Sequence, residues 1–409
     1  MRFLYEIGIQ GYRCAILLAS LFNPKAKKWV KGRQQLFRHL KTAFQGNKEE
    51  IAWFHCASLG EFEQGRPIIE RFKESYPSHK VLLTFFSPSG YEIRKDYAGA
   101  DYIFYLPADT YRNARRFYAI VKPRVLFLVK YEYWYNYLHI LSRADVPIYV
   151  ISAVFRKSQP FFRGYGAWFR KQLKGIRCFF LQDKQSAALL NQIGLSRYVI
   201  TGDTRVDRVL DIAAKSVVSE KISAFCAQQR VWVCGSTWPI DEAMIVKAIP
   251  LLPKDVKIII APHEVDPTHI TTILNTFGEE AVRYADYDPQ KNHHRILVID
   301  CIGYLSATYR CANLAYIGGG FGAGIHNILE AAVYGIPVLF GPNNAKFPEA
   351  EGLQKTGGGY EVKNQETLNV LLERLLNHQT HYKEACQGSS SFIQKNRGAT
   401  ANVFKNLNL

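Results

Sequence analysis

Short apolar runs alternate along the chain with longer stretches in which polar and apolar residues are mixed. From residue 51 the apolar runs are IAWFHCA, KVLLTFF, RVLFLVK, VPIYVISAV, CFFLQD and YVITGD. The stretches between them, such as EFEQGRPIIERFKESYP and PSGYEIRKDYA, are typical of amphipathic helices. Because parallel strands are joined by helical crossovers, this alternation predicts βαβ units that build a parallel sheet.

A second series of apolar runs follows a polar, helix-prone segment at residues 204–230. Its members are RVWVCGS, VKIIIAP, RILVID, LAYIGGG and IPVLFGP, and they predict a second parallel sheet. The chain has 409 residues, and hydrophobic cores tend to divide beyond about 250 to 300 residues. We therefore predict two α/β domains of similar size, joined near residue 205, with a cleft between them.

The N-terminal segment has a different pattern, with an apolar stretch followed by a basic run. Its apolar residues are Phe3, Leu4, Ile7, Tyr12, Ile16, Leu17 and Leu21, and its basic run is Lys25, Lys27, Lys28, Lys31 and Arg33. The uncharged part, residues 14–22, is shorter than the ~20 residues that span a bilayer. No A-x-A-like cleavage site follows it, so a secretory signal is not favoured. The pattern favours a helix lying in a membrane interface; the alternative is an amphipathic helix packed on its own domain.

The net charge and the cysteine content of the chain indicate which binding partners and which cellular compartment to expect. The chain carries 52 Lys and Arg against 35 Asp and Glu, a formal net charge of +17 that attracts nucleic acid, phosphorylated metabolites or anionic membranes. The basic residues are scattered and no known nucleic-acid-binding motif is present, which disfavours nucleic acid. The eight cysteines include no C-x-x-C pair and no zinc spacing, so we expect reduced thiols in a cytosolic compartment.

Ligands of open α/β sheets bind beyond the carboxyl ends of the strands, which directs attention to the strand-to-helix turns. In HCASLGEFEQG, residues 55–65, Ser58 and Glu61 have the spacing of a capping box, which explains both residues without any function. Gly60 stands in the first helical turn and gives a ligand room to approach Glu61. Glu61 is therefore a candidate general base toward an acceptor hydroxyl.

Two further turns of the first domain are polar. FFSPSGYE, residues 85–92, places Ser87, Ser89 and Gly90 at a helix start, where they either cap the helix or bind an anion. VKYEYWYNYL, residues 129–138, surrounds Lys130 and Glu132 with aromatic residues. This segment is either a solvated ion pair over an aromatic cluster or a wall that recognises a sugar or acyl chain, and both interpretations stay open.

In the second domain the donor-rich turns are GSTWPIDE, residues 235–242, and APHEVDP, residues 261–267. Ser236 and Thr237 offer donors to a phosphate, and His263 offers a charge-assisted hydrogen bond to the same group. A lone histidine is more often structural, so the argument depends on several neighbouring strand ends being rich in donors.

The densest signal is GGGFGAGIHNILEAAVYGIPVLFGP, residues 318–342, where five of the seven residues 318–324 are glycine. We expect a strand, a tight turn, a helix over 325–334 and a further strand, with the glycines allowing close approach of a ligand. Asn327 and Glu330 lie three apart on one helical face, suited to a nucleotide's phosphate and hydroxyl groups. The segment matches the weak dinucleotide fingerprint G-x-G-x-x-A, but no acidic residue ends the following strand, which argues against a dehydrogenase. The absence of G-K-[ST] excludes a Walker A loop.

Taken together, these turns resemble one known family. The strongest elements are ASLGE at 57–61, SPSG at 87–90, GSTWPIDE at 235–242 and the glycine-rich stretch. In this combination the chain resembles the 3-deoxy-D-manno-octulosonic acid (Kdo) transferases of lipopolysaccharide synthesis, from its N-terminus to about residue 360. The resemblance implies an α/β fold of GT-B type, with two Rossmann-like parallel-sheet domains facing a central cleft and an N-terminal membrane-associating helix.

The resemblance also implies a division of the chain and an activity. Residues 1–35 would associate with the membrane, 36–205 bind the acceptor and 206–409 bind the nucleotide sugar, the last helix crossing back to the first domain. The family moves Kdo from CMP-Kdo to a lipid A precursor of lipid IVA type at the cytoplasmic face of the inner membrane. The implied partners are CMP-Kdo, that precursor and the anionic membrane surface, without nucleic acid.

Residue roles follow from the family's motifs. The A-S-x-G-E motif makes Glu61 the base that deprotonates the acceptor hydroxyl, so that the anomeric centre is inverted in one displacement. Lys130 and Arg205 are expected to stabilise transition-state or phosphate charge. Expected CMP contacts are Ser236, Thr237, Pro262, His263, Ile302, Gly303, Tyr304, Gly320, Asn327, Ile328, Leu329 and Glu330. The expected acceptor or Kdo region is Ser58, Gly60, Ser87, Ser89 and Gly90. No metal or other cofactor is expected, because lysine and arginine are available to balance the leaving group and no Asp/His cluster is present.

The chain departs from the family's pattern at three places. It reads Ala261-Pro262-His263 where many members have Pro-Arg-His, so an arginine that would pair with phosphate is missing. The G-N-L-K-x-D element becomes residues 202–207, which keep a cation at Arg205. In the element M-E-T-E-L-W, Lys130 stands where a carboxylate is usual. These changes affect the phosphate and acceptor contacts and leave Glu61 and the glycine-rich turn unchanged.

Two other functions are compatible with parts of the pattern. A soluble GT-B transferase or epimerase acting on a UDP-sugar would bind UDP in preference to CMP and would not associate with membranes. A basic, non-catalytic membrane-binding protein would retain its function after Glu61→Gln. Nucleotide titrations and this substitution therefore separate the three hypotheses.

Overall fold

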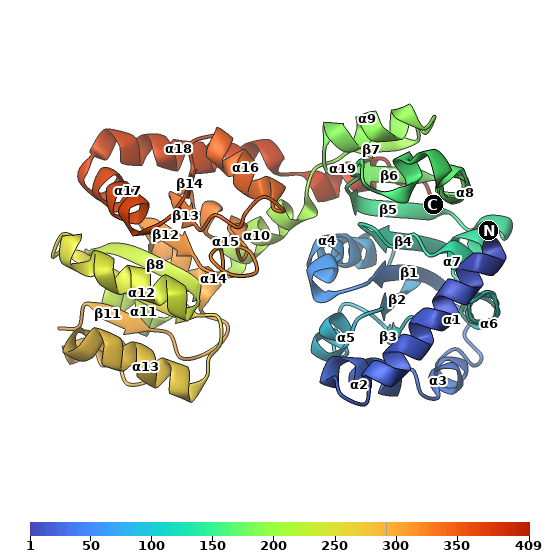
Figure 1. Cartoon of the computed structure of the whole chain (residues 1–409), viewed down its shortest axis with the longest axis horizontal. Helices are drawn as coiled ribbons and strands as arrows, with labels where there is room; N and C mark the ends of the chain where they lie inside the picture. The colour runs from blue at the N-terminus through green and yellow to red at the C-terminus, as the bar shows by residue number, and fades with distance from the viewer. Residues whose placement is uncertain (292) are drawn as a thin grey trace. The chain divides into compact units, whose positions relative to one another are not determined.

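The structure is a computed structural model that describes residues 1–291 and 293–409, and it contains two compact units (Figure 1). Unit 1 comprises residues 1–208 and 397–409, and unit 2 comprises residues 209–396. Each unit is built around a seven-stranded sheet whose neighbouring strands all pair in parallel. The predicted pair of parallel-sheet α/β domains is thus confirmed.

Unit 1 has the strand order β3-β2-β1-β4-β5-β6-β7. The strands are β1 Glu50–Cys56, β2 His79–Phe85, β3 Tyr102–Tyr105, β4 Val125–Val129, β5 Ile148–Ala153, β6 Cys178–Leu181 and β7 Tyr198–Ile200. The helices are α1 Arg2–Ala19, α2 Pro24–Lys31, α3 Leu36–Ala43, α4 Leu59–Ser75, α5 Pro88–Arg94, α6 Tyr111–Val121, α7 Tyr135–Arg143, α8 Ala167–Leu173, α9 Lys184–Gln192 and α19 Ala399–Lys405.

Unit 2 has the strand order β10-β11-β9-β8-β12-β13-β14. The strands are β8 Arg230–Thr237, β9 Val256–Pro262, β10 Ala281–Arg283, β11 Ile296–Val298, β12 Leu314–Ile317, β13 Val338–Phe340 and β14 Gly359–Glu361. The helices are α10 Thr204–Lys215, which begins in unit 1, α11 Glu220–Cys226, α12 Pro239–Ala248, α13 Pro267–Phe277, α14 Leu305–Thr308, α15 Leu329–Ala332, α16 Pro348–Lys355, α17 Gln365–Asn377 and α18 Gln379–Asn396.

The central strands are buried on both faces, which explains why they read as continuous apolar runs. In β1, Ile51 and Trp53 belong to the core on one side of the sheet, whereas Ala52 and Phe54 belong to the core on the other side. All four side chains are at most 1% exposed. The helices that cover these faces bury the apolar side of each crossover.

The N-terminal segment folds as a helix, α1, whose inner face packs on unit 1. The Tyr5 hydroxyl donates to Asp109 Oδ2 at 2.6 Å, and Glu6 Oε1 accepts from the amide of Asn136 at 2.8 Å. The carboxyl of Asp109 is buried, and this burial raises its pKa to about 6. The inner face of α1 therefore behaves as the second interpretation of the sequence proposed, a helix packed on its own domain.

The opposite side of α1 carries apolar side chains that remain exposed, and we call them the outer stripe. Its members are Phe3, Leu4, Ile7, Leu18, Leu21 and Phe22, each at least 52% exposed. Within the part of the chain that the structure describes, no helix combines the length and apolar character needed to cross a bilayer. Association of the outer stripe with a membrane surface stays a prediction.

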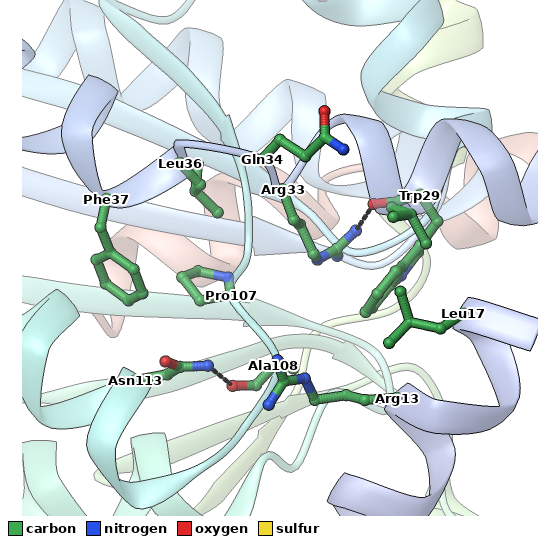
Figure 2. Close-up of a pocket in the computed structure, with 11 residues that line it drawn as sticks. Arg13, Leu17, Trp29, Arg33, Gln34, Leu36, Phe37, Pro107, Ala108 and Asn113 are labelled. Carbon is green, nitrogen blue, oxygen red and sulfur yellow. Dashed lines mark hydrogen bonds between the residues drawn. The ribbon is translucent and has the colours of Figure 1, made fainter. Parts of the chain in front are cut away.

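One member of the predicted basic run does not lie on the surface. The guanidinium of Arg33 lies over the ring of Trp29, 3.8 Å from its centroid, and donates to the backbone oxygen of that residue (Figure 2). It also donates to the backbone oxygens of Leu106 and Phe86. Burial lowers the pKa of Arg33 to about 9. The sequence could not separate Arg33 from its neighbours, because only the fold brings the turns after β2 and β3 against it.

Candidate functional site

The strand order places the candidate base of unit 1 where ligands of open α/β sheets bind. Strands β1 and β4 are neighbours, and the chain proceeds from β1 toward one edge of the sheet and from β4 toward the other. Glu61 follows β1 and Lys130 follows β4, so both lie beyond the carboxyl ends of these strands. This reversal of strand order forms the crevice in which such sheets hold their ligands.

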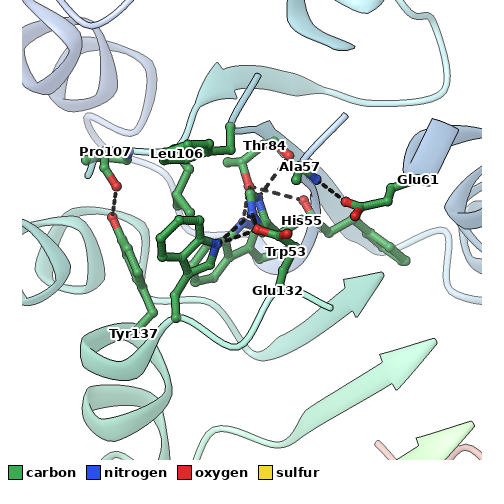
Figure 3. A network of polar contacts seen from close by, with 12 residues as sticks. Trp53, His55, Ala57, Glu61, Thr84, Leu106, Pro107, Glu132 and Tyr137 are labelled. Atoms are coloured by element: carbon green, nitrogen blue, oxygen red, sulfur yellow. Dashed lines mark hydrogen bonds and ion pairs between the residues drawn. The ribbon is translucent and has the colours of Figure 1, made fainter. Parts of the chain in front are cut away.

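Glu61 is held by backbone donors at the start of α4 (Figure 3). Its Oε2 accepts a hydrogen bond from the Ala57 N–H at 2.5 Å. Burial, reinforced by the negative charge of Glu132, raises the pKa of Glu61 to about 8, although the Ala57 N–H and Lys130 oppose the shift. The predicted capping box is not formed, because the side chain of Ser58 makes no capping hydrogen bond. Glu61 is thus positioned as a carboxyl group that titrates near neutral pH.

A buried polar network lies beside Glu61, and its central residue, His55, is not among the site residues predicted from the sequence. The ring of His55 is fully buried, with Nδ1 2.9 Å from the Thr84 hydroxyl and Nε2 3.4 Å from Glu132 Oε2 (Figure 3). The indole N–H of Trp134 donates to the same carboxylate oxygen at 2.7 Å. The only sequence signal for His55 is its position at the end of β1, and its partners come from β2 and the segment after β4.

Lys130 adopts a backbone conformation that is rare for a lysine. Its φ is +63°, in the left-handed region, where the backbone of residues other than glycine and asparagine is strained. The amide oxygen of Gln64, in the orientation that satisfies its neighbours, accepts from Lys130 Nζ at 2.7 Å and from Arg205 Nε at 3.2 Å. Gln64 therefore brings both predicted cations together on the side of Glu61.

Arg205 is additionally fixed by a carboxylate from its own turn. Its NH2 group lies 2.6 Å from Asp203 Oδ2, and its Nε also donates to that carboxylate. Such a two-point contact holds the plane of the guanidinium in one orientation. The cation that the sequence places at the start of α10 is thus rigidly positioned.

The predicted acceptor residues differ in how the fold uses them. At Gly60 an added Cβ would meet nothing within 4 Å, so the space beside Glu61 is open. Ser87 caps α5, since its oxygen accepts from the Ser89 N–H, which agrees with the capping interpretation. At Gly90 a Cβ would lie 2.3 Å from the ring of Phe85, so packing alone accounts for this glycine.

Unit 2 has its own strand reversal, between β8 and β12. Ser236, near the end of β8, has a φ of +53°, in the left-handed region like that of Lys130. Thr237 is fully buried and its hydroxyl donates to Glu242 Oε1 at 2.9 Å, so this predicted phosphate donor is engaged within the protein. Glu242 in turn contacts His269 Nε2 at 2.9 Å.

The glycine-rich turn after β12 is explained in large part by backbone packing. A Cβ at Gly318 would lie 2.2 Å from the Ser236 oxygen, and one at Gly320 would lie 2.6 Å from the backbone of Gly341. Gly319 and Gly324 have φ values of +89° and +141°. Packing against the ends of two neighbouring strands thus accounts for Gly318 and Gly320 without a ligand.

A stack of aromatic rings lies on the same edge of unit 2. The rings of Trp238 and His263 are 4.9 Å apart, and those of His263 and His326 are 4.1 Å apart. The indole N–H of Trp238 donates to His326 Nε2 at 3.1 Å. Burial, together with His263, lowers the pKa of His326 to about 4, so this ring is neutral near pH 7. His263 itself is exposed and offers an aromatic face and a polar edge to a ligand.

The segment after the glycines is less helical than expected. The predicted helix over 325–334 is confined to α15, Leu329–Ala332, since the preceding residues follow the irregular path of the glycine-rich turn. Asn327 Nδ2 donates to Glu330 Oε1 at 3.0 Å, and Glu330 Oε2 accepts from the Ser306 hydroxyl at 2.6 Å. The predicted pair is therefore side by side.

The other predicted CMP contacts of unit 2 differ in their exposure and in their backbone conformation. Ile328 and Leu329 are fully buried, so only their backbone groups can face a ligand. Ile302 is 89% exposed, and Gly303 has a φ of +104°. Pro262 ends β9, and the ring of Tyr304 lies 4.9 Å from that of Tyr284. Among residues 1–291 and 293–409, no group of three or more His, Cys, Asp or Glu side chains is placed to hold a metal ion.

Comparison with known proteins identifies the architecture first. The solved UDP-GlcNAc 2-epimerase from Neisseria meningitidis, bound to UDP-GlcNAc, superposes with a TM-score of 0.61 over 87% of this chain and 98% of that one. The sequences are 14% identical, so this likeness establishes the fold alone. The shared feature is a pair of parallel-sheet α/β units, as in proteins of GT-B-like fold.

Sequence relatives are more specific. The chain is 25% identical to the 3-deoxy-D-manno-octulosonic acid transferase of Chlamydophila psittaci, over 95% of this chain and 93% of the relative. It is 24% identical to a bifunctional glycosyltransferase/methyltransferase of Fusobacterium nucleatum subsp. nucleatum, over 95% of this chain but only 62% of that longer protein. The sequence model described as 3-deoxy-D-manno-octulosonic-acid transferase (kdotransferase) matches residues 31–208, which lie in unit 1. The predicted resemblance is thus confirmed, since residues 31–208 match the Kdo transferase model and the chain is similar over most of its length to a Kdo transferase.

Proposed function

We propose that this protein transfers Kdo from CMP-Kdo to a lipid A precursor of lipid IVA type, with inversion at the anomeric centre. The observation that carries this proposal is the position of Glu61, a buried carboxyl group at the carboxyl end of β1, within the matched part of the chain. Its surroundings offer open space at Gly60 for a substrate, and Gln64 of the same helix contacts the cations Lys130 and Arg205.

In the proposed reaction, Glu61 accepts the proton of the acceptor hydroxyl as that oxygen attacks the anomeric carbon of Kdo. A base works best when its pKa lies near the operating pH, and a pKa of about 8 meets this condition. The C–O bond to CMP breaks in the same displacement, and CMP leaves with the bonding electron pair. Lys130 and Arg205 offset negative charge near the reacting centre.

Unit 2 is assigned to the donor. The exposed ring of His263 and the backbone around Ser236 and Gly320 would contact the nucleotide, while Asn327 and Glu330 would bind its hydroxyl groups. The missing arginine of the turn after β9 leaves His263 as the polar residue available there. The remaining residues predicted from the sequence contribute backbone groups or packing.

The outer stripe of α1 and the lysines of α2 are assigned to the membrane surface. Lys25, Lys27, Lys28 and Lys31 are exposed, as are the apolar residues of the stripe. An apolar face beside basic residues binds anionic lipid surfaces. We therefore propose that the protein acts at the cytoplasmic face of the inner membrane, where its lipid acceptor would be present.

The test is mass spectrometry of a lipid A precursor incubated with the protein and freshly generated CMP-Kdo. A mass increase by one or more Kdo units supports the proposal and counts the additions. Glu61→Gln should abolish this transfer while CMP still binds, because the substitution removes the base and keeps its shape. An unshifted mass with an active donor, together with binding of UDP in preference to CMP, would instead favour a UDP-sugar enzyme.

A further inference from the structure

A cavity of ≈290 Å³ lies in unit 1 between α1, α2, α3 and the turn after β3 (Figure 2). Its walls include Leu17 of α1, Trp29 of α2, Leu36 and Phe37 of α3, and Pro107. Pockets for whole drug-sized ligands range from about 300 to 1,000 Å³, so this cavity suits a smaller apolar group. The volume corresponds to roughly ten groups of the size of a water molecule or a methylene, at about 30 Å³ each.

Two cations line the apolar walls, and within residues 1–291 and 293–409 neither forms an ion pair with a carboxylate. Arg13 lines the cavity, and its NH1 donates to the neutral Gln10 oxygen at 2.7 Å. Arg33 also lines the cavity, but its guanidinium is engaged by backbone oxygens and aromatic rings. Arg13 therefore has donors left for an anion at the edge of an apolar space.

Both the apolar character and the positive charge of the cavity continue onto the surface around it. Leu17 is 50% exposed and is followed directly by Leu18 of the outer stripe, so apolar surface continues from the stripe to the cavity wall. The exposed lysines of α2 are on the same helix as Trp29. An apolar cavity surrounded by positively charged side chains is complementary to an anionic lipid, which carries both an acyl chain and a negatively charged group.

Aromatic contacts connect α1 with the network beside Glu61. Tyr12 of α1 stacks on Phe86 with ring centroids 6.2 Å apart, and Phe86 packs on Trp134 at 4.7 Å. Trp134 donates to Glu132, whose charge acts on Glu61. A chain of contacts within unit 1 thus leads from α1, which forms one wall of the cavity, to the network beside Glu61.

We propose that this cavity receives one acyl chain of the anionic lipid acceptor, with Arg13 pairing with a phosphate of the same molecule. The proposal rests on the transferase function proposed above, because it takes the acceptor to be an acylated, phosphorylated lipid. The acyl chain would hold the acceptor on unit 1 while its sugar hydroxyl extends toward Glu61.

The first test is calorimetric titration with dodecyl phosphate below its micelle concentration, a probe that needs no glycosyl transfer. Leu17→Trp fills the cavity, and Ile93→Trp in α5 is the control, since Ile93 is 57% exposed and belongs neither to the cavity walls nor to the outer stripe. Each methylene that is excluded weakens binding roughly fourfold. We expect Leu17→Trp to weaken binding at least tenfold and Ile93→Trp to change it less than twofold. Equal affinities in the two variants, or no binding to the native protein, would overturn the proposal.

A second variant that fills the cavity controls for misfolding of the first one. A second, uncharged probe separates the contribution of the phosphate group from that of the acyl chain. Val30→Phe fills the same cavity from α2, so a folding defect confined to Leu17→Trp does not decide the result. Arg13→Gln should weaken dodecyl phosphate several-fold and leave the uncharged dodecyl maltoside unchanged. Equal effects on the two probes would remove Arg13 from the site.

Transfer assays then distinguish this proposal from the proposed function. With an acylated acceptor, Leu17→Trp should raise KM at unchanged kcat, and with a deacylated acceptor it should match the native protein. Equal KM increases with both acceptors would refute an acyl site. If the native protein binds dodecyl phosphate in the cavity but transfers no Kdo, the assignment to the acceptor falls together with the proposed function.

Discussion

Replacing Glu61 with glutamine should stabilise unit 1, and the gain should grow with pH. In the folded protein the carboxyl group has a pKa of about 8, raised from 4.5 mainly by burial and next by Glu132. The folded state therefore holds a proton between these two pH values that the unfolded state releases. With the unfolded state binding fewer protons, the free energy of unfolding falls as pH rises through this window.

The size of the effect follows from the same shift. The free energy of unfolding should fall by ~1.4 kcal/mol per pH unit between pH 4.5 and about 8, reaching at most about 3 kcal/mol at pH 7. Glutamine has no proton to lose and can still accept the hydrogen bond from the Ala57 N–H. The difference between Glu61→Gln and the native protein should thus be near zero at pH 4.5 and greatest above pH 8.

The assay is urea unfolding at pH 5, 6, 7 and 8, followed by tryptophan fluorescence for the transition of unit 1. Glu74→Gln, at a carboxylate of α4 that is 67% exposed, serves as the control and should change stability by no more than about 0.5 kcal/mol. Parallel pH dependences for Glu61→Gln and the native protein would refute the reasoning, as would a variant less stable at every pH. Loss of transfer in the more stable variant would then separate the catalytic role of Glu61 from a structural one.

Three other substitutions test the site and the surface. Gly320→Ala should destabilise unit 2 by about 1 to 3 kcal/mol in urea unfolding, because its Cβ would meet backbone at 2.6 Å, whereas Gly322→Ala, whose nearest contact is 3.6 Å, should be near neutral. Glu132→Gln removes a charge that raises the pKa of Glu61, so the acid limb of the pH–rate profile should move to lower pH, and an unmoved limb would contradict the coupling. Leu18→Glu in the outer stripe should reduce binding to anionic vesicles several-fold at an unchanged melting temperature, and undiminished binding would count against a membrane role for the stripe.

The central parts of both sheets could be predicted, because strands buried on two faces read as continuous apolar runs. The strands that escaped prediction, β3, β10 and β14, all lie at sheet edges. All three are short, four residues in β3 and three in each of the others, and every side chain of β10 is at least partly exposed. An edge strand buries less apolar surface, so its sequence shows less of the pattern on which prediction depends.

The candidate site was predictable where a motif marks a strand end and not where the fold combines separate segments. Glu61 and Lys130 stand in recognisable turns, but the left-handed backbone of Lys130 leaves no trace in its residue type. His55 acquires its partners from two other strands, which no local pattern reveals. The glycines at 318 and 320 illustrate the converse, since their spacing suggested a ligand and the fold shows neighbouring backbone.

The docking of α1 has a consequence for biosynthesis. Tyr5 binds Asp109, 104 residues later in the chain, and Glu6 binds Asn136, 130 residues later. At bacterial and eukaryotic elongation rates of about 5 to 20 residues per second, roughly 6 to 26 s separate the synthesis of Glu6 from that of Asn136. During that interval the nascent helix has no partner for its polar side, while its apolar side is already complete. A ribosome translating this chain therefore exposes the apolar side of α1 well before the sheet of unit 1 is complete. Chaperones or lipid can bind this helix first.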